Sequence, residues 1–143
     1  MGFYNVMAIG SSGMRAQRVR MEVLSSNLSN INTTRSADGR PYQRMVPVFR
    51  AQEVGSEFAT VLQDERKLYE VMVDEVKTDD REPIQVYEPD HPDADENGYV
   101  YYPNISTAEE MVSIMSATRG YEANLTAVNA AKEMAKRAIE LAR

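Results

Sequence analysis

The 143 residues suit a single domain of ordinary size, and without an apolar run of eighteen residues we expect no membrane span. The chain has no cysteine, which excludes disulfides, thiolate metal sites and a cysteine nucleophile. The net charge of −6 divides into +5 over residues 1–50, −13 over residues 51–110 and +2 over residues 111–143, and so acidic a middle repels nucleic acid.

The first predicted element is a long helix from Phe3 to about Thr33. Its apolar residues recur every seven positions, in one register at Met7, Met14, Met21 and Leu28 and in a companion register at Phe3, Leu24 and Ile31. A repeat of seven predicts a narrow seam buried against another helix. The segment Gly10-Ser11-Ser12-Gly13 indicates either a bend or a place where another backbone comes close. Asn30 is expected to cap the end of this helix.

The middle of the chain, residues 36–104, is predicted to be an antiparallel β-rich insert. Runs of β-branched and aromatic residues between turn formers predict strands at Tyr42–Phe49, Phe58–Leu62, Leu68–Val76, Ile84–Tyr87 and Tyr99–Tyr102. The insert is too small for a large core, so we expect it to pack on the helices or on a neighbour. Its acidity fits a solvated surface, and a second interpretation is that it docks the basic ends of another subunit.

The last predicted element is a second long helix, which begins near Ser106. Ser106-Thr107-Ala108-Glu109 is a capping-box pattern, and about 37 residues predict a helix roughly 55 Å long. One seven-residue register holds Met111, Thr118, Leu125, Lys132 and Ile139, and the other holds Ile114, Tyr121, Val128, Ala135 and Ala142. Asn124 and Asn129, in mid-helix beside these seams, are expected to form interhelical hydrogen bonds.

The predicted fold is therefore α+β, with terminal helices over residues 1–35 and 105–143 that form one coiled-coil-like core around the β-rich insert. Helices with such seams close on each other or on other chains, which is typical of an assembly subunit. The residues expected at subunit interfaces are Met7, Met14, Met21, Leu24, Leu28, Ile31, Met111, Ile114, Thr118, Tyr121, Asn124, Leu125, Val128 and Asn129.

Motifs for catalysis or cofactor binding are few. The one histidine, His91, leaves no zinc ligand pair, and we find no phosphate loop or dinucleotide fingerprint. Asp93-Ala94-Asp95-Glu96-Asn97-Gly98 matches the first half of a calcium loop, but its twelfth position is Asn104 where a bidentate carboxylate is required. We interpret it as an acidic turn with Gly98 at a positive φ, and predict no enzyme, no metal and no cofactor.

Two other functions remain open. A soluble binding module, in which a self-contained helical hairpin presents an acidic β surface to a basic partner, would be a monomer with stable termini. A carboxylate-dependent hydrolase would require a pocket with shifted acid pKa values, and nothing in the sequence indicates one.

The ends of the chain resemble the bacterial flagellar rod and hook proteins. The N-terminal motifs are Ser11-Ser12-Gly13-Met14-Arg15-Ala16-Gln17-Arg18, Ser26-Asn27-Leu28-Ser29-Asn30 and Asn32-Thr33-Thr34-Arg35. The last of these motifs, followed by Gly39 and Pro41-Tyr42, is similar to the form of the signature in proximal rod proteins rather than in distal rod or hook proteins. The later motifs are Val86-Tyr87-Glu88-Pro89-Asp90-His91-Pro92-Asp93-Ala94, Gly98-Tyr99-Val100, Ser116-Ala117-Thr118-Arg119-Gly120-Tyr121-Glu122-Ala123-Asn124 and Asn129-Ala130-Ala131-Lys132.

This resemblance implies a non-enzymatic subunit of the flagellar basal body. Such a subunit is exported unfolded by the flagellar export apparatus, without a cleavable signal peptide, and assembles in the periplasm with its terminal helices in the core of a tube. The implied partners are copies of itself, other rod proteins, the basal adaptor of the rod, and ring or peptidoglycan components near the acidic insert.

Overall fold

A computed structural model describes residues 3–53 and 68–141 of the chain. Its elements, in chain order, are α1 (Phe3–Ser29), β1 (Met45–Glu53), β2 (Tyr69–Thr78), β3 (Ile84–Tyr87), β4 (Tyr99–Tyr102) and α2 (Thr107–Leu141). Two long terminal helices enclose a small antiparallel β insert, so the α+β prediction is confirmed. The predicted strand Phe58–Leu62 lies outside the described residues.

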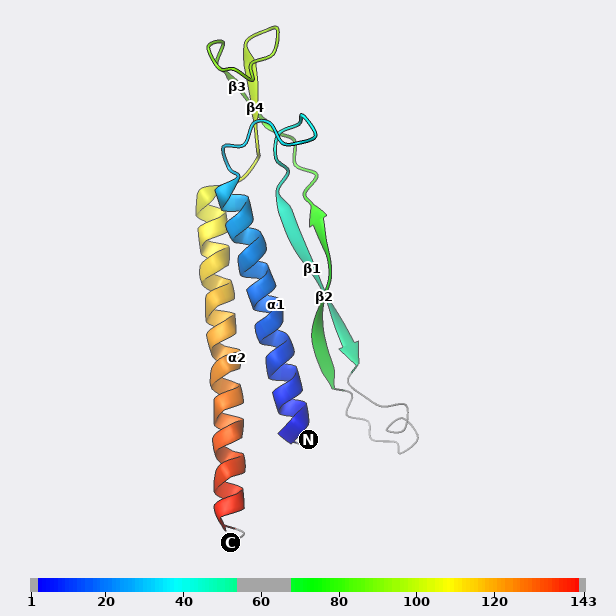
Figure 1. The fold of residues 1–143 in the computed structure, drawn as a ribbon. Helices are drawn as coiled ribbons and strands as arrows, with labels where there is room; N and C mark the ends of the chain where they lie inside the picture. The colour runs from blue at the N-terminus through cyan, green and yellow to red at the C-terminus, as the bar shows by residue number, and fades with distance from the viewer. Residues whose placement is uncertain (1–2, 54–67, 142–143) are drawn as a thin grey trace.

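The molecule is elongated, with α1 as its middle layer (Figure 1). α2 runs antiparallel along one side of α1, and the β1–β2 hairpin lies along the other side. At 1.5 Å per residue, the 27 residues of α1 span about 40 Å and the 35 residues of α2 about 52 Å. The C-terminal end of α2 therefore projects past the start of α1 (Figure 1).

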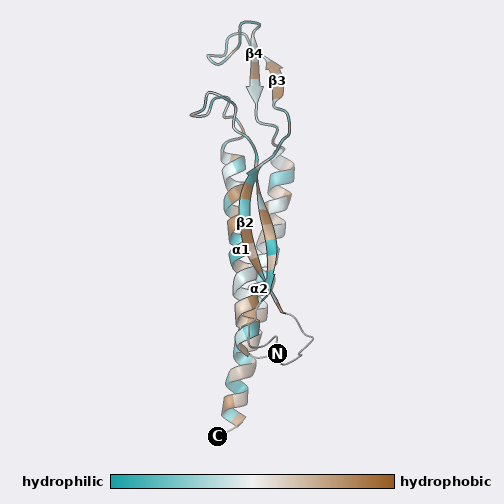
Figure 2. Ribbon diagram, turned by 90° about the vertical axis from the view of Figure 1, so that its right-hand side faces the viewer, coloured by the Kyte–Doolittle hydropathy of each residue, from teal (hydrophilic) through white to brown (hydrophobic). Residues whose placement is uncertain are grey.

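The apolar core is thin. In the described part of the chain the buried hydrophobic residues are Ala16, Leu24, Val100, Ile105, Ala117, Val128 and Ala131, three of them alanines. Many large apolar side chains remain exposed, and hydrophobic segments appear along the outside of the helices and the hairpin (Figure 2). So little internal burial is expected of a chain that completes its core against other chains.

The β1–β2 hairpin is held against α1 by contacts to its strand edges. β1 and β2 pair antiparallel, with a register shift between Val48 and Phe49, and they cross each other in projection (Figure 1). The side chain of Asn27 bonds the backbone of Met45 on β1, and Ser12 Oγ accepts a hydrogen bond of 3.2 Å from the amide of Val71 on β2. β3 and β4 form a second two-stranded sheet beyond the helix ends.

Several boundaries differ from the sequence-based expectation. α1 ends at Ser29 rather than Thr33, because Asn30 turns the chain and its Nδ2 donates to the Ser26 carbonyl at 2.9 Å. Asn30 therefore caps the helix as predicted. β1 and β2 begin and end later than expected, since strand pairing, rather than composition, sets their ends.

Candidate functional site

The two helices approach closely where α1 and α2 carry glycine. A Cβ added at Gly10 would clash with the Val128 side chain, and one added at Gly13 would lie 2.8 Å from Asn124 Nδ2. On α2, a Cβ at Gly120 would lie 3.2 Å from Gln17 Cδ. The segment Gly10–Gly13 is thus a place of close helix approach, one of the two predicted alternatives, and α1 is continuous through it.

The predicted seam residues of α1 border this contact. Leu24 is buried, while Met7, Met14, Met21, Leu28 and the post-helical Ile31 are half-buried. Met21 reaches across to α2, where its sulfur accepts a hydrogen bond of 3.4 Å from Thr118 Oγ1. α1 therefore uses its glycines and Leu24 for the intramolecular contact and keeps part of each methionine accessible.

The two predicted registers of α2 have different environments. Val128 is buried against α1, and Ile114 and Tyr121 of its register are half-buried, as is the neighbouring Asn124. Thr118, which belongs to the other register, is half-buried as well. In the other register, Met111 is 53% exposed, Leu125 40% and Ile139 66%. Met111, Leu125 and Ile139, named here the exposed register, thus keep two fifths or more of their surface accessible in the described chain.

Asn124 does not form the interhelical hydrogen bond that the sequence predicted. Its Nδ2 donates to the carbonyl of Gly120 in its own helix at 2.9 Å, because the helices are so close at Gly13 that its amide packs there without a polar partner on α1. Asn129 is exposed, and no described residue bonds it across the helix pair, so an interhelical bond from Asn129 to another chain stays a prediction.

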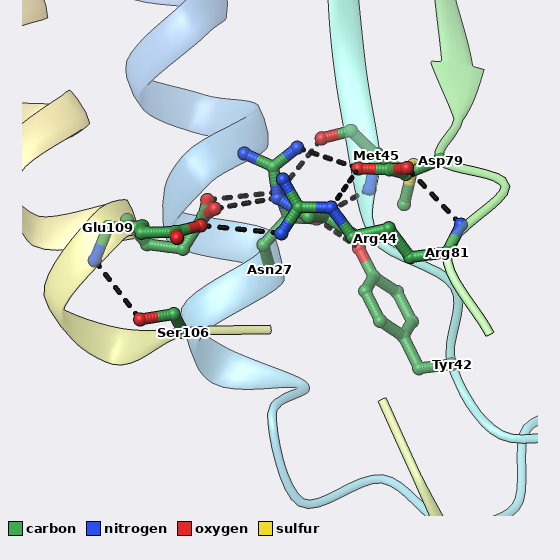
Figure 3. A network of polar contacts seen from close by, with 9 residues as sticks. Asn27, Tyr42, Arg44, Met45, Asp79, Arg81, Ser106 and Glu109 are labelled. Atoms are coloured by element: carbon green, nitrogen blue, oxygen red, sulfur yellow. Dashed lines mark hydrogen bonds and ion pairs between the residues drawn. The ribbon is translucent and has the colours of Figure 1, made fainter. Parts of the chain in front are cut away.

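A buried polar cluster joins the helix ends to the hairpin (Figure 3). Asn27 and Glu110 are both fully buried, and Asn27 Nδ2 donates to Glu110 Oε2 at 3.2 Å. Arg44 Nε lies 2.7 Å from Glu110 Oε1. Tyr42 OH donates to Asn27 Oδ1 at 3.1 Å. The cluster thus satisfies a carboxylate that would otherwise be costly to bury.

The cluster continues toward the surface through Asp79, the first residue after β2. Arg44 Nη1 and Arg81 Nε contact Asp79 Oδ2 at 3.1 and 3.2 Å, and Arg81 Nη1 contacts Glu109 Oε2 at 3.3 Å. Burial opposes the charge of Arg44, but hydrogen bonding and attraction to Glu110 and then Asp79 raise its pKa above the ordinary value. Arg44 is therefore a permanent cation at the junction of α1, α2 and the β1–β2 hairpin.

Other sequence-based expectations are settled at the same end of the molecule. The Glu109 amide donates to Ser106 Oγ at 3.4 Å, as the capping box predicted. Gly98 has a φ of +82°, as the acidic-turn interpretation requires. Asp93 accepts a hydrogen bond from Thr34 at 2.7 Å and pairs with Arg35, so it ties this turn to the loop after α1.

Neither a membrane-spanning helix nor a metal-binding group was found in residues 3–53 and 68–141. None of the helices described there is long and apolar enough to cross a membrane. The same residues contain no group of three or more histidines and carboxylates that could hold a metal ion.

Comparison with known proteins gives matches at both helices and over the whole chain. The family profile "Flagella basal body rod protein" matches residues 7–35, and "Flagellar basal body rod FlgEFG protein C-terminal" matches residues 96–141. The flagellar basal-body rod protein FlgC of Aquifex aeolicus is 41% identical, covering 98% of this chain and 97% of its own. The proteins of that name from Bacillus subtilis and Salmonella typhimurium are 38% and 34% identical, covering 96% and 99% of this chain and 97% and 98% of their own.

Proposed function

This chain belongs to the FlgC family of flagellar basal-body rod proteins, and we propose that its two helices pack into the core of a helical tube built from many subunits. It is a structural subunit of the rod in the flagellar basal body. In the proposed tube the helices transmit torque and surround the export channel, while the β insert faces outward. Its neighbours are copies of itself and other rod proteins.

The observation that carries this proposal is the exposed register of α2. Met111, Leu125 and Ile139 follow the seven-residue spacing of an interhelical seam, yet each is at least 40% exposed. Covering such side chains contributes roughly 1.5–3 kcal/mol each when fully buried. A self-contained binding module would also pair α1 with α2, but it would have no need for a second apolar register along the pair.

The projecting end of α2 supports the same mode of assembly. Met134, Ile139 and Leu141 are 66%, 66% and 88% exposed, and they lie where α2 runs past the start of α1. A contact between different surfaces of neighbouring subunits, repeated without closure, generates a helix. We assign Met7, Met14, Met21, Leu28, Met111 and Leu125 to these contacts.

Further partners follow from the same placement. The subunit passes through the flagellar export apparatus and is located in the periplasmic part of the basal body. Its end of the rod meets the basal adaptor, and the acidic insert faces ring or peptidoglycan components.

Substitution of Leu125 tests the proposed packing. Leu125→Asp places a carboxylate in the exposed register and leaves the contact with α1 intact, so the purified chain should keep its helicity while cells lose rods and motility. Thr126→Asp, one residue further and exposed, is the matched control and should leave rods intact. A motile Leu125→Asp strain with normal rods would show that this register is not an interface.

A further inference from the structure

A small pocket with two arginines opens on the helical pair. It has a volume of about 200 Å³ and is lined by Ser11, Met14, Arg15, Arg18 and Tyr121. Arg15 is exposed and forms no ion pair within the described chain. The one ion pair of Arg18 among the described residues is with Glu22, with Nε 3.8 Å from Oε1 and both side chains 67% exposed. Such an exposed pair contributes little, so both guanidinium groups remain available for another anion.

The segment between β3 and β4, residues 88–98, has the opposite character. This acidic tip holds five carboxylates and no lysine or arginine. Asp90 and Glu96 are exposed and have no bonding partner in the described chain. Tyr87 and Tyr99 at its base stack edge to face with ring centroids 5.3 Å apart, and Tyr87 is 63% exposed. The acidic tip thus presents carboxylates beside aromatic rings.

The pocket and the acidic tip of one chain are too far apart to meet. The tip extends beyond the end of the helical pair, where α1 ends and α2 begins (Figure 1). Arg15 and Arg18 lie in the middle of α1, and Ser29 at its end is eleven residues, or about 16 Å, beyond Arg18. Any contact between the two surfaces must therefore join different molecules.

We propose that the pocket receives the acidic tip of a second copy of this chain. Arg15 and Arg18 would pair with carboxylates of the tip, and Met14 and Tyr121 would pack against its tyrosines. Arginine and aromatic side chains are enriched where interfaces bind most strongly, and complementary charge fixes the partner and the register. Because the two surfaces differ, the contact repeats from copy to copy. This inference rests on the proposed assembly and specifies one of its contacts.

Cysteine cross-linking tests the contact without background, because the chain has no cysteine. A strain carrying Ser11→Cys and Asn97→Cys places one thiol at the pocket and one on the acidic tip, and both carboxylates and arginines are retained. Oxidation of isolated basal bodies should give a ladder of linked copies, with the 11–97 disulfide identified by mass spectrometry. The pair Ser25→Cys and Asn97→Cys, with the first thiol on an exposed face of α1, should give none.

Charge reversal provides a second test. Arg15→Glu with Arg18→Glu should abolish the cross-link, and adding Asp90→Arg with Glu96→Arg should restore it, whereas Arg119→Glu on α2 should have no effect. Assembled rods without the 11–97 disulfide would overturn the inference, as would equal cross-linking in the Ser25/Asn97 control pair. A third contrary result is that Asp90→Arg with Glu96→Arg does not restore the cross-link in the chain with both arginines reversed. If rods form normally with both arginines reversed while Leu125→Asp prevents them, the inference fails and the proposed function stands.

Discussion

Asn27 bonds Met45 as one strand residue bonds another, although Asn27 lies on a helix. Its Nδ2 donates to the Met45 carbonyl at 2.8 Å, and its Oδ1 accepts from the Met45 amide at 2.8 Å. An edge strand normally leaves these groups open to other chains. Here a single buried amide pairs with Met45, the first residue of β1, and anchors the start of the hairpin to α1.

Replacing Asn27 with alanine should therefore detach the start of the hairpin. The Met45 backbone and the Tyr42 hydroxyl would lose their partner, and each buried group left unsatisfied costs about 1–3 kcal/mol. Urea unfolding followed by circular dichroism should show the lower stability, and the Met45 amide should exchange faster with solvent. Asn32→Ala, at an exposed site just after α1, should change neither measurement. Equal unfolding free energies for the two variants would contradict this role.

Glu110 and Arg44 should behave as a coupled pair. Glu110→Leu leaves the Arg44 guanidinium, whose side chain is 15% exposed, without its shorter ion pair, and breaking a buried pair on one side costs about 3–5 kcal/mol. Arg44→Met combined with Glu110→Leu should lose less than the sum of the two single changes. The free energies of unfolding of the four chains measure the coupling, and simple additivity would exclude it.

Gly10→Ala should weaken the helix pair even though alanine favours helix by about 1 kcal/mol. The new methyl group meets Val128, which is buried and β-branched and therefore has little rotameric freedom. Overpacking of this kind costs about 1–3 kcal/mol. Thermal unfolding should show a lower midpoint, whereas Ser25→Ala on an exposed face of α1 should not lower it. A higher midpoint for Gly10→Ala would mean that the helices separate without cost.

Tyr102 should ionise at a higher pH than an ordinary tyrosine side chain. Its hydroxyl donates to Glu88 Oε2 at 2.9 Å, and this bond, with burial and the carboxylate charge, raises its pKa above the ordinary 10. Because the folded pKa is the higher one, the stabilisation is complete below pH 10 and is lost as the pH rises through the folded pKa. NMR titration of the Tyr102 ring should show this, and Glu88→Gln should shift its pKa down. An unchanged pKa in Glu88→Gln would rule out the carboxylate as the cause.

The sequence predicted the elements that depend on local chemistry. The Ser106 cap on the Glu109 amide, the cap at Asn30 and the left-handed turn at Gly98 all follow from short-range preferences, and all three are present. The other half of the predicted capping box is not, because the Glu109 carboxylate pairs with Arg81. The short hairpin strands Ile84–Tyr87 and Tyr99–Tyr102 were also located residue for residue, because turn formers bound them closely on both sides.

The contact between the helices was harder to predict. Seven-residue periodicity detects large apolar side chains, whereas the intramolecular contact depends on Gly10, Gly13 and Gly120, where the absence of a side chain permits the approach. The polar cluster was missed altogether, since Arg44, Asp79 and Glu110 come together only through pairings across 35 and 66 residues of chain. No local pattern marks such residues, although a glutamate one turn into a capped helix was a weak signal.

Because the apolar core is thin, the stability of each subunit in an assembled rod depends on how many neighbours cover it. Three of the seven buried hydrophobic residues in the described part of the chain are alanines, so the subunit gains little stability from its own interior and more from the neighbour that covers its exposed register. A subunit surrounded on all sides is therefore held much more firmly than one with an open flank. The proposed tube should consequently lose subunits from its ends, where the terminal subunit has the fewest neighbours, and resist breakage in its middle.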